Sequence, residues 1–408
     1  MSLVTPSSVR VTPGLPLELV FCSRCVISNQ RPSSAVEFKN TTQTKKQTIG
    51  FDEDGVCSAC RYQEIKEKEI DWGVREKELL VLLDQHRSRD GSYDCIVPGS
   101  GGKDSAFTSH ILKHKYGMHP LTVTWAPHLY TDIGWQNMQS WIHTGGFDNI
   151  LFSGNGRVHA LLTRLAFENL LHPFQPFIIG QRHIGPRFAV KFNIPLVFYG
   201  ENQAEYGNTI EENFSPTMKR EFYAFDQTLD QLFLGGVSAR ELVDMKQVSV
   251  NDLNPYLPSQ KKDIERVGVQ VHYLGYYLNW DPQECFYYAS ANTGFQPNKE
   301  RTEGSYSKYS SIDDKVDPFH YFTTLVKFGI GRATYDAAQE IRNGKITREE
   351  GVALVRRFDT EFPQKYFQEF LTYIGITEER FWEVVNQWRA PHLWKNENGE
   401  WTLRNRVS

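Results

Sequence analysis

The chain has 408 residues, of which 40% are hydrophobic and 13% aromatic, a composition that excludes a mostly disordered protein and allows two or three domains. Its 45 basic and 49 acidic residues leave a net charge of -4, so the overall charge does not favour nucleic acid or an anionic membrane. Apolar runs fall well short of the ~18 residues of a membrane span, and residues 1–20 lack the pattern of a signal peptide, so we expect a cytoplasmic protein.

The chain begins with a proline-containing stretch, residues 1–20, which we interpret as an extended lead-in without a role. Residues 21–61 hold two Cys-x-x-Cys pairs around a polar stretch, which predicts a small metal-binding unit. Residues 62–90 follow with the apolar spacing of a helix among dense charges.

Strand-like and helical segments alternate over the next part of the chain. Strands are expected at 93–98, 121–126, 150–152, 177–179 and 194–199, and helices at 105–115, 137–144, 158–171 and 185–192. The alternation predicts an α/β domain over residues 62–215, built on a doubly wound parallel sheet. Such sheets bind ligands at the carboxyl ends of their strands, so the turns after the expected strands are the first candidate sites.

The second half of the chain is less regular. We expect a mixed insertion or substrate-binding region at 216–315, with a helix from Phe222 to Met245 and an extended segment from Val269 to Leu278. Strong helical periodicity then predicts a C-terminal helical region over residues 316–408.

Four of the six cysteines form two pairs, Cys22 with Cys25 and Cys57 with Cys60. Each pair can turn two thiolates toward one ion, and two pairs complete a tetrahedral set of four sulfur ligands. A closed set leaves no position for a substrate, so we expect a structural metal in a ribbon over residues 21–61. Zinc is favoured and iron stays open, because both accept four cysteines.

A glycine-rich run, PGSGGKDS, extends from Pro98 to Ser105 between an expected strand and an expected helix. Glycines let a backbone approach a phosphate closely, and a helix start offers N–H groups and a positive dipole end. The run is not a Walker A motif, because Val97 stands where that motif needs glycine and Asp104 follows the lysine. It is not a dinucleotide fingerprint, because Asp104 occupies the position of the third glycine.

The run does match in full the SGGxDS loop of the PP-loop ATP pyrophosphatases, with Ser100, Gly101, Gly102, Lys103, Asp104 and Ser105. In that family the loop holds the pyrophosphate of ATP while AMP passes to an oxygen of carbonyl type, and the aspartate helps to hold Mg2+. The resemblance implies an adenine nucleotide alpha hydrolase-like fold, with ATP and Mg2+ bound at these residues.

From about residue 20 to residue 390 the chain resembles the N-acetyl sugar amidotransferases, bacterial enzymes that make acetamidino sugars for lipopolysaccharide O-antigen or flagellin glycans. The resemblance rests on the cysteine pairs, the glycine-rich loop and the runs YTDIG at 130–134, IPLVFYGEN at 194–202, EYG at 205–207, KFGIGRA at 327–333 and EIR at 340–342. Residues 1–20 depart from the family's pattern.

This resemblance implies an ATP-dependent, AMP-forming carbon–nitrogen ligase. Adenylation turns the N-acetyl carbonyl oxygen of a sugar or nonulosonate into a leaving group, and ammonia displaces AMP to give an acetamidino sugar. The family receives its ammonia from a separate glutaminase assembled with a cyclase-like subunit. The residues also indicate a partner, because Cys95 and Cys285 lack the signs of a glutaminase nucleophile and are expected to be inert core thiols.

Three residues are expected to act in catalysis. Lys103 should stabilise charge on the pyrophosphate, Asp104 should hold Mg2+ unless it only caps a helix, and Glu201 follows a buried strand in a ligand-facing turn. The binding candidates, each with a structural alternative, are Trp125 for adenine and Asp132, Asn137, Asn202, Glu205, Lys327 and Arg332 for the substrate. Evenly balanced between ligand and surface roles are Arg182, His183, Arg301, Glu303 and Ser305.

Lys327 and Arg332 flank Gly329 and Gly331 inside a helical pattern. Glycine there costs ~1 kcal/mol relative to alanine. Either close approach to a phosphate or a break between helices would explain the two glycines.

Two other functions are considered. Some PP-loop enzymes adenylate a base of tRNA and add sulfur, but they use a persulfide cysteine near the loop and a basic surface, neither of which the sequence favours. A non-catalytic zinc-ribbon scaffold with a relic loop is disfavoured because the SGGKDS run is intact.

Overall fold

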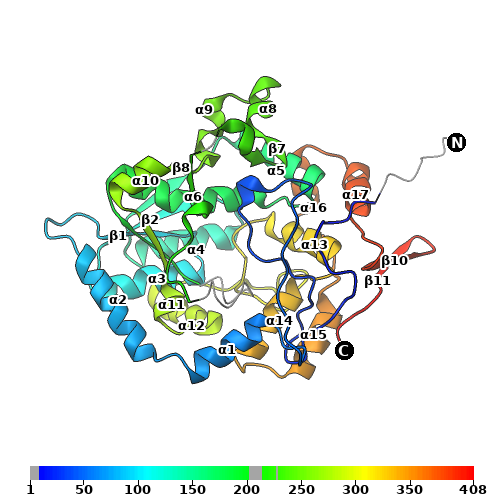
Figure 1. Cartoon of the computed structure of the whole chain (residues 1–408), viewed down its shortest axis with the longest axis horizontal. Helices are drawn as coiled ribbons and strands as arrows, with labels where there is room; N and C mark the ends of the chain where they lie inside the picture. Colours follow the sequence, from blue (N-terminus) through cyan, green and yellow to red (C-terminus); the bar gives the residue numbers. More distant parts are fainter. Residues whose placement is uncertain (1–8, 202–213, 227) are drawn as a thin grey trace.

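The computed structural model describes residues 9–201, 214–226 and 228–408. Its centre is a five-stranded sheet in the order β3-β2-β1-β4-β9, in which all neighbouring strands are parallel (Figure 1). The strands are β1 Cys95–Pro98, β2 Pro120–Trp125, β3 Asn149–Phe152, β4 Leu196–Tyr199 and β9 Gln270–Tyr273. The sheet confirms the parallel α/β fold that the alternating pattern predicted.

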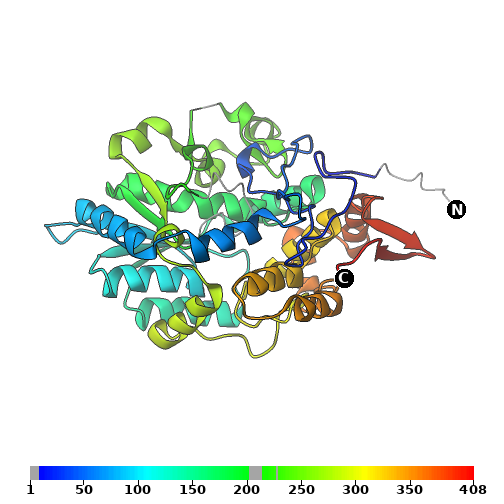
Figure 2. The same ribbon diagram turned by 60° about the horizontal axis from the view of Figure 1, so that its bottom comes forward.

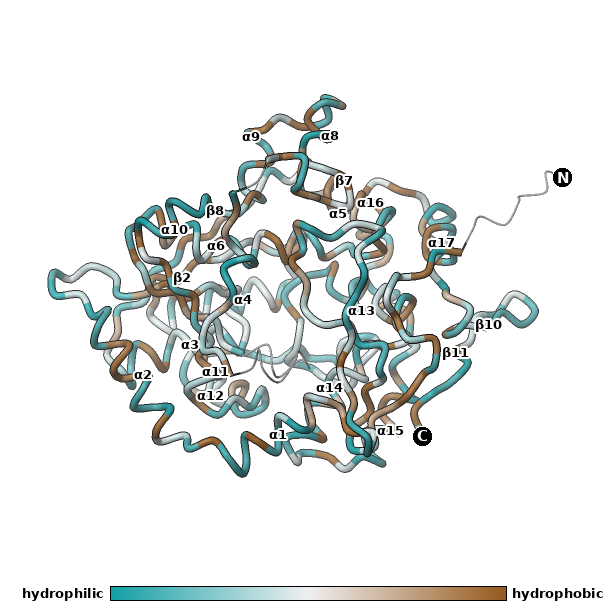
Figure 3. The backbone as a smooth tube through the Cα atoms, in the orientation of Figure 1, coloured by the Kyte–Doolittle hydropathy of each residue, from teal (hydrophilic) through white to brown (hydrophobic). Residues whose placement is uncertain are grey.

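Helices cover both faces of the sheet because alternate strand residues point to opposite sides. Ile96 of β1 faces a core formed with α5 and α6, and Val97 faces a core formed with α2 and α3. Helix α12 packs on α3, farther from the sheet. These helices are α2 Trp72–His86, α3 Lys103–His114, α4 Asp132–His143, α5 Gly156–Leu170, α6 Gln175–Phe192, α11 Leu274–Tyr277 and α12 Pro282–Thr293. Hydrophobic residues gather around the central strands, near β2 in Figure 3.

The order of the strands creates a switch point beside β1. The chain runs from β1 outward to β2 and β3 and then returns to place β4 on the other side of β1. Loops after β1 and β4 therefore diverge, and ligands of such sheets bind in the crevice between them. The glycine-rich loop follows β1, and Gly200 with Glu201 follows β4, so two groups of candidates from the sequence meet at this crevice.

Three sequence predictions of secondary structure are wrong in whole or in part. In the extended segment expected from Val269 to Leu278, only Gln270–Tyr273 is a strand, and Leu274–Tyr277 is helical. The run 177–179, expected as a strand, lies inside α6, where Phe177 and Ile179 are buried helical residues. A short apolar run cannot by itself distinguish a buried strand from a buried helix. The helix expected from Phe222 to Met245 is instead a series of short elements, and only Ala239–Asp244 is α-helical.

Strand β9 lies within the span expected to be an insertion, yet it pairs with β4 along four residues and completes the sheet. The sheet therefore extends past the boundary expected at residue 215. The part of this span that precedes β9 consists of short elements, of which α8 and α9 project at the top of Figure 1 and α10 lies beside α6. Its elements are η3 Arg220–Phe222, β5 Ala224–Phe225, η4 Leu229–Gln231, β6 Phe233–Leu234, β7 Val237–Ser238, α8 Ala239–Asp244, α9 Val250–Leu253, η5 Asn254–Tyr256, β8 Ser259–Gln260 and α10 Lys261–Val267.

Five helices fill most of the C-terminal region, in agreement with the helical periodicity of the sequence. Helices α13, α16 and α17 share an aromatic core in which Phe319 and Phe370 stack with ring centroids 4.3 Å apart, whereas α14 and α15 pack against the cysteine pairs. A terminal hairpin, which was not expected, projects at the end of the molecule opposite α2 (Figures 1 and 2). The elements are α13 Asp317–Phe328, α14 Arg332–Arg342, α15 Arg348–Phe358, α16 Phe367–Ile374, α17 Glu378–Gln387, β10 Trp394–Glu397 and β11 Glu400–Leu403.

Residues 310–316 fix this C-terminal region to the edge of the sheet where the parallel strands end. The carboxylate of Asp314 accepts hydrogen bonds from the backbone and from the ring Nδ1 of His128, both at 2.7 Å. Gly134 in α4 gives this segment room, because a Cβ there would lie 2.5 Å from the Cα of Asp313. The contacts place α13 opposite the glycine-rich loop.

The N-terminal region has little regular structure apart from η1 Glu37–Lys39 and α1 Ser58–Lys68. Isolated bridges, including Pro32 with Thr48, hold the rest. Within the described ranges, no helix has both the length and the apolar character needed to cross a membrane.

Candidate active site

The glycines of the loop serve two purposes. Gly101 has φ +80°, and a Cβ there would lie 2.8 Å from the Cα of Met138 in α4, while a Cβ at Gly99 would lie 2.1 Å from that of Ser105. Both glycines are therefore required by packing. At Gly102 the nearest atom to a Cβ would be the Oγ of Ser100 at 3.7 Å, so this is the position where the backbone lies open.

Helix α3 begins at the open side of this loop. Its N-cap residue, Gly102, has no side chain to cap the helix, which leaves first-turn N–H groups and the positive dipole end facing the crevice. One oxygen of Asp104, Oδ2, accepts a hydrogen bond from Nζ of Lys103 at 2.6 Å. The other, Oδ1, is buried and has no hydrogen-bond partner among the described residues. Uncapped amides, an ammonium and an open carboxylate oxygen fit a phosphate chain with a divalent cation.

Lys103 keeps its charge although it is only 8% exposed. Burial opposes that charge, but the pKa of Lys103 is raised because Asp104 lies beside it and Glu201 adds a further negative charge. A buried ammonium beside the loop is suited to stabilising negative charge that develops there.

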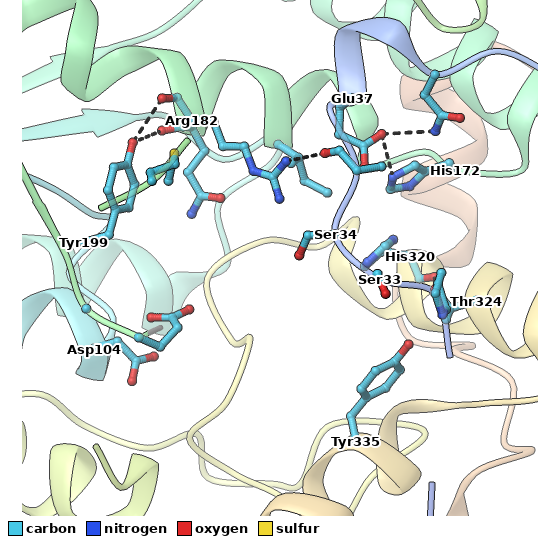
Figure 4. Close-up of a pocket in the computed structure, with 18 of the residues that line it drawn as sticks. Ser33, Ser34, Glu37, Asp104, His172, Arg182, Tyr199, His320, Thr324 and Tyr335 are labelled. Atoms are coloured by element: carbon cyan, nitrogen blue, oxygen red, sulfur yellow. Dashed lines mark hydrogen bonds and ion pairs between the residues drawn. The ribbon is translucent and has the colours of Figure 1, made fainter. Parts of the chain in front are cut away.

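Three adjoining hollows open in front of the loop, with volumes of about 530, 290 and 380 Å³. Figure 4 shows the largest, with Asp104 and Tyr199 on the sheet side and Ser33, His320 and Tyr335 across from them. Their walls come from both halves of the molecule, since the loop and β4 face α13 and α14.

One face of α13 forms the wall opposite the loop. His320, Thr324 and Lys327 follow at spacings of four and three residues, so they share a face of the helix, and all three line the largest hollow. The ammonium of Lys327 donates a hydrogen bond to the carbonyl of Leu170 at 2.7 Å. This wall explains why a helical region remote in sequence belongs to the site.

The second wall is a strap, which we define as residues 31–46, between the two cysteine pairs. It lines the largest hollow with Arg31, Ser33, Ser34, Glu37, Asn40 and Lys46. In Figures 1 and 2 it belongs to the dark blue segment that passes in front of the C-terminal helices. It is attached to α6, because Arg182 donates to the carbonyl of Ala35 at 2.6 Å and Gln175 donates to that of Glu37 at 2.8 Å.

Glu37 is the acidic residue of the strap. Burial opposes its charge, but His172, at 3.6 Å, and the nearby Lys46 and Arg182 hold the pKa of Glu37 well below its usual range. Conversely, burial lowers the pKa of His172 despite that carboxylate. The strap therefore presents a fixed anion next to neutral and cationic side chains.

The two cysteine pairs meet as predicted, with the four sulfur atoms within 4.8 Å of one another. Cys22 lies 3.9 Å from Cys60, and Cys25 lies 3.8 Å from Cys57. A tetrahedral ion with ligand bonds of about 2.3 Å holds its sulfurs about 3.8 Å apart, so the set fits one zinc-sized ion. Backbone N–H groups of Arg24, Cys25 and Cys57 point at Cys22 Sγ, as expected for a thiolate acceptor.

The metal set, which we define as Cys22, Cys25, Cys57 and Cys60, packs against the C-terminal helices. Cys22 and Cys25 share a core with Phe328, Ala338 and Val355. The strap, residues 31–46, lies between Cys25 and Cys57 in the chain, so one ion at this position would anchor the chain on both sides of a cavity wall.

The structure separates the other predicted residues into two groups. Glu201, Lys327 and Arg332 line the hollows. Trp125 is 4% exposed in the main core, which favours the structural alternative. Asn137 lines the second hollow, but its amide is already bonded to the backbone of Gln296 at 2.8 and 2.9 Å. Asp132 is exposed at the start of α4 and lines none of these hollows, and Asn202 and Glu205 lie outside the described residues.

Gly329 and Gly331 serve a helix break. Gly329 ends α13 with φ +66°, and the N–H of Gly331 donates to the carboxylate of Asp359 at 2.9 Å at the start of α14. Arg332, next in the chain, pairs with Asp336 at 3.1 Å on the wall of the third hollow.

Arg182 and His183 were evenly balanced between ligand and surface roles in the sequence. Arg182 lines the largest hollow, whereas His183 is buried against the carbonyl of Tyr256. Arg301 forms an ion pair with Glu361, away from the hollows. Sequence reasoning did not select His172, His320, Glu37 or Tyr335. The position of His320, seven residues before Lys327, was the one available signal.

Replacing Lys327 with methionine is expected to change the pH dependence of stability. Burial, and to a lesser degree Lys46, lowers the pKa of Lys327 from 10.5 to about 7 in the folded protein. Between those pH values the unfolded chain binds one more proton than the folded protein. The free energy of unfolding of the wild type therefore rises by about 3 kcal/mol between about pH 6 and about pH 9.5 because of this group. The variant has no titrating group at this position and lacks that rise. Compared with the wild type, it is therefore more stable at about pH 6 than at about pH 9.5. Urea denaturation at both pH values measures this, and an equal difference at the two would contradict it.

Comparison with known proteins adds one family match. Residues 303–408 match the family described as "LPS biosynthesis protein WbpG-like, C-terminal domain". The matched part includes α13 and α14, which form the wall opposite the glycine-rich loop.

Two further similarities are weaker. An uncharacterized protein of Methanocaldococcus jannaschii is 33% identical over 88 residues, which are 21% of this chain and 29% of that protein. NMN synthetase from Francisella tularensis aligns over 48% of this chain and 94% of that chain, with 15% identity and a TM-score of 0.24. A similarity this low carries no argument about fold or activity.

Proposed function

We propose that this protein is an ATP-dependent, AMP-forming amidotransferase that converts the N-acetyl group of a sugar or nonulosonate to an acetamidino group. The observation that carries the proposal is the intact loop, Ser100–Ser105, at the switch point of the sheet and facing three hollows. The lipopolysaccharide description of the family matched by residues 303–408 supports a sugar as the acceptor.

In this proposal, different residues bind the nucleotide, the cation and the acceptor. The open backbone at Gly102 and the first turn of α3 bind phosphate, and Lys103 stabilises charge on the departing pyrophosphate. Asp104 would hold Mg2+ through its unpartnered oxygen, and the ion would neutralise phosphate charge when bound. The acceptor would lie between the loop and the α13 wall, with Glu201 at the sheet edge.

Ammonia is proposed to come from a glutaminase partner. Four of the six cysteines belong to the metal set. Cys95 and Cys285 are 0% and 2% exposed, and burial raises the pKa of both thiols, so neither is suited to act as a glutaminase nucleophile.

Cys285 bears on the sulfur-transfer alternative. The charges of Asp104 and Lys103 both influence its thiol, so this cysteine lies closer to the loop than the sequence indicated. A persulfide carrier must be reachable and easily ionised, and Cys285 is neither. The amidotransferase reaction is therefore the better supported of the two.

Mass spectrometry of a defined mixture tests the proposal. The protein is incubated with ATP, Mg2+, ammonium and a panel of N-acetylated nucleotide sugars and nonulosonates. The expected result is replacement of one oxygen by NH in an acceptor, with equal amounts of AMP and pyrophosphate. Formation of ADP, or of AMP only with tRNA and a sulfur donor, would contradict it.

A further inference from the structure

His320 occupies the junction of the three hollows. Among the described residues, only His320 and Asp104 line all three. His320 comes from the first turn of α13, whereas Asp104 comes from the first turn of α3, so the two residues belong to opposite walls. A ligand that extends from the loop toward the α13 wall must pass between them.

The imidazole of His320 is held in one orientation by aromatic neighbours. It stacks on His172 with centroids 5.2 Å apart and planes 27° apart, and on Phe174 at 5.2 Å and 22°. Figure 4 shows the ring beside Ser33 of the strap and Thr324 of the same helix. A ring fixed in this way presents its nitrogens in a constant direction.

The same ring is an unused base. Its Nδ1 is buried and has no hydrogen-bond partner among the described residues. Burial lowers its pKa well below the usual value, and the neighbouring charges of His172, Arg332 and Lys327 act in the same direction against the opposing Glu37. A neutral imidazole has one nitrogen that accepts a proton.

The other bases of the cavity are engaged or line fewer of the three hollows. Asp313 and Asp317 line only the second hollow. Glu37 and His172 line only the largest. One oxygen of Asp104 is paired with Lys103, and the charge of Glu201 also acts on that lysine. The amine of Lys327 is bonded to the carbonyl of Leu170 and lines only the largest of the three hollows. His320 is therefore the base best placed to serve the acceptor.

We propose that His320 is the catalytic base that takes a proton from the nitrogen nucleophile as it adds to the adenylated acetamido carbon. This inference rests on the proposed amidotransferase function. The lone pair of ammonia forms the new C–N bond, and one N–H proton passes to the imidazole. The C–O bond to AMP then breaks, and its electron pair leaves with the phosphate. Solvent takes the proton from His320 after product release.

The proposal predicts that His320→Phe separates the two halves of the reaction. Phenylalanine retains a ring between His172 and Phe174 but has no basic nitrogen. Acceptor-dependent exchange of pyrophosphate into ATP reports adenylation and should stay at the wild-type rate. Amidine formation with ammonium should fall by about 10²-fold, the usual effect of removing a general base.

Controls make the result specific to the base. His143→Gln removes an exposed histidine at the end of α4, outside the hollows, and should leave both rates unchanged. His320→Gly should recover part of its amidine formation when free imidazole is added. A purely structural role would not respond to imidazole.

Each remaining outcome counts against the inference. Two results would overturn the role of His320 and leave the amidotransferase function intact. In the first, His320→Phe forms the amidine at the wild-type rate. In the second, exchange and amidine formation fall equally and imidazole restores neither. Failure of the wild-type protein to form AMP with any acceptor would instead overturn the proposed function, and this inference with it.

Discussion

Lys103→Met is expected to lower the rate of acceptor-dependent pyrophosphate exchange by about 10³-fold, the effect of removing a preorganised charge from a reacting centre. The lysine is buried, its pKa is raised by Asp104, and it stands at the start of α3 beside the open backbone at Gly102. Methionine retains much of its length and apolar stem but contributes no charge. Exchange kinetics with labelled pyrophosphate measure the effect, and nucleotide binding should weaken much less than turnover.

The matched control is Lys113→Met, which removes a lysine from the same helix. Lys113 bonds to the carbonyl of Gly146, far along α3 from the loop. Its variant should show the wild-type exchange rate. Lys103→Met with an undiminished rate would contradict a role for this ammonium on the leaving pyrophosphate.

Cys22→Ser is expected to remove the metal and with it one wall of the cavity. Structural zinc sites contribute on the order of 10 kcal/mol of binding free energy, which becomes folding energy of the segment they close. Here that segment includes the strap, residues 31–46, whose Arg31, Glu37 and Lys46 line the largest hollow. We expect the variant to contain no bound metal, to show rapid amide exchange over residues 30–50, and to lose acceptor binding.

Elemental analysis of the wild type identifies the ion, for which zinc is the prediction. Cys95→Ala is the control, since Cys95 is buried in β1 outside the metal set. This control should retain one ion per chain and protected amides in the strap. A metal-free Cys22→Ser protein with unchanged exchange over residues 30–50 would show that the strap does not depend on the ion.

Local patterns predicted the parts of the site that lie close together in sequence. The glycine-rich loop was identified because a strand, a turn and a helix follow within a few residues, and the cysteine set because two identical spacings repeat. Both are properties of short segments, whose geometry depends on neighbouring residues more than on distant packing.

Packing between segments that are far apart in sequence explains which predictions were wrong and which site residues the sequence did not indicate. Phe177 and Ile179 belong to a strand-like apolar run, but they lie in α6 and are buried in the core that this helix shares with the sheet. Trp125 ends a strand at the binding edge, yet the helix beside it approaches so closely that a Cβ at Gly180 would lie 2.1 Å from the indole. No local pattern distinguishes these positions from ligand-facing ones.

The sequence by itself determined the parallel α/β class, the glycine-rich loop between a strand and a helix, and the four-cysteine cluster, because each depends on residues close together along the chain. The tertiary structure alone decided that the strap, α6 and α13 enclose the cavity with this loop. Glu37, His172 and His320 come from three separate segments, and their approach results from the burial of aromatic and aliphatic surface between the sheet and the C-terminal helices. That burial depends on the total apolar area of the fold, so no single motif records which polar side chains it brings together.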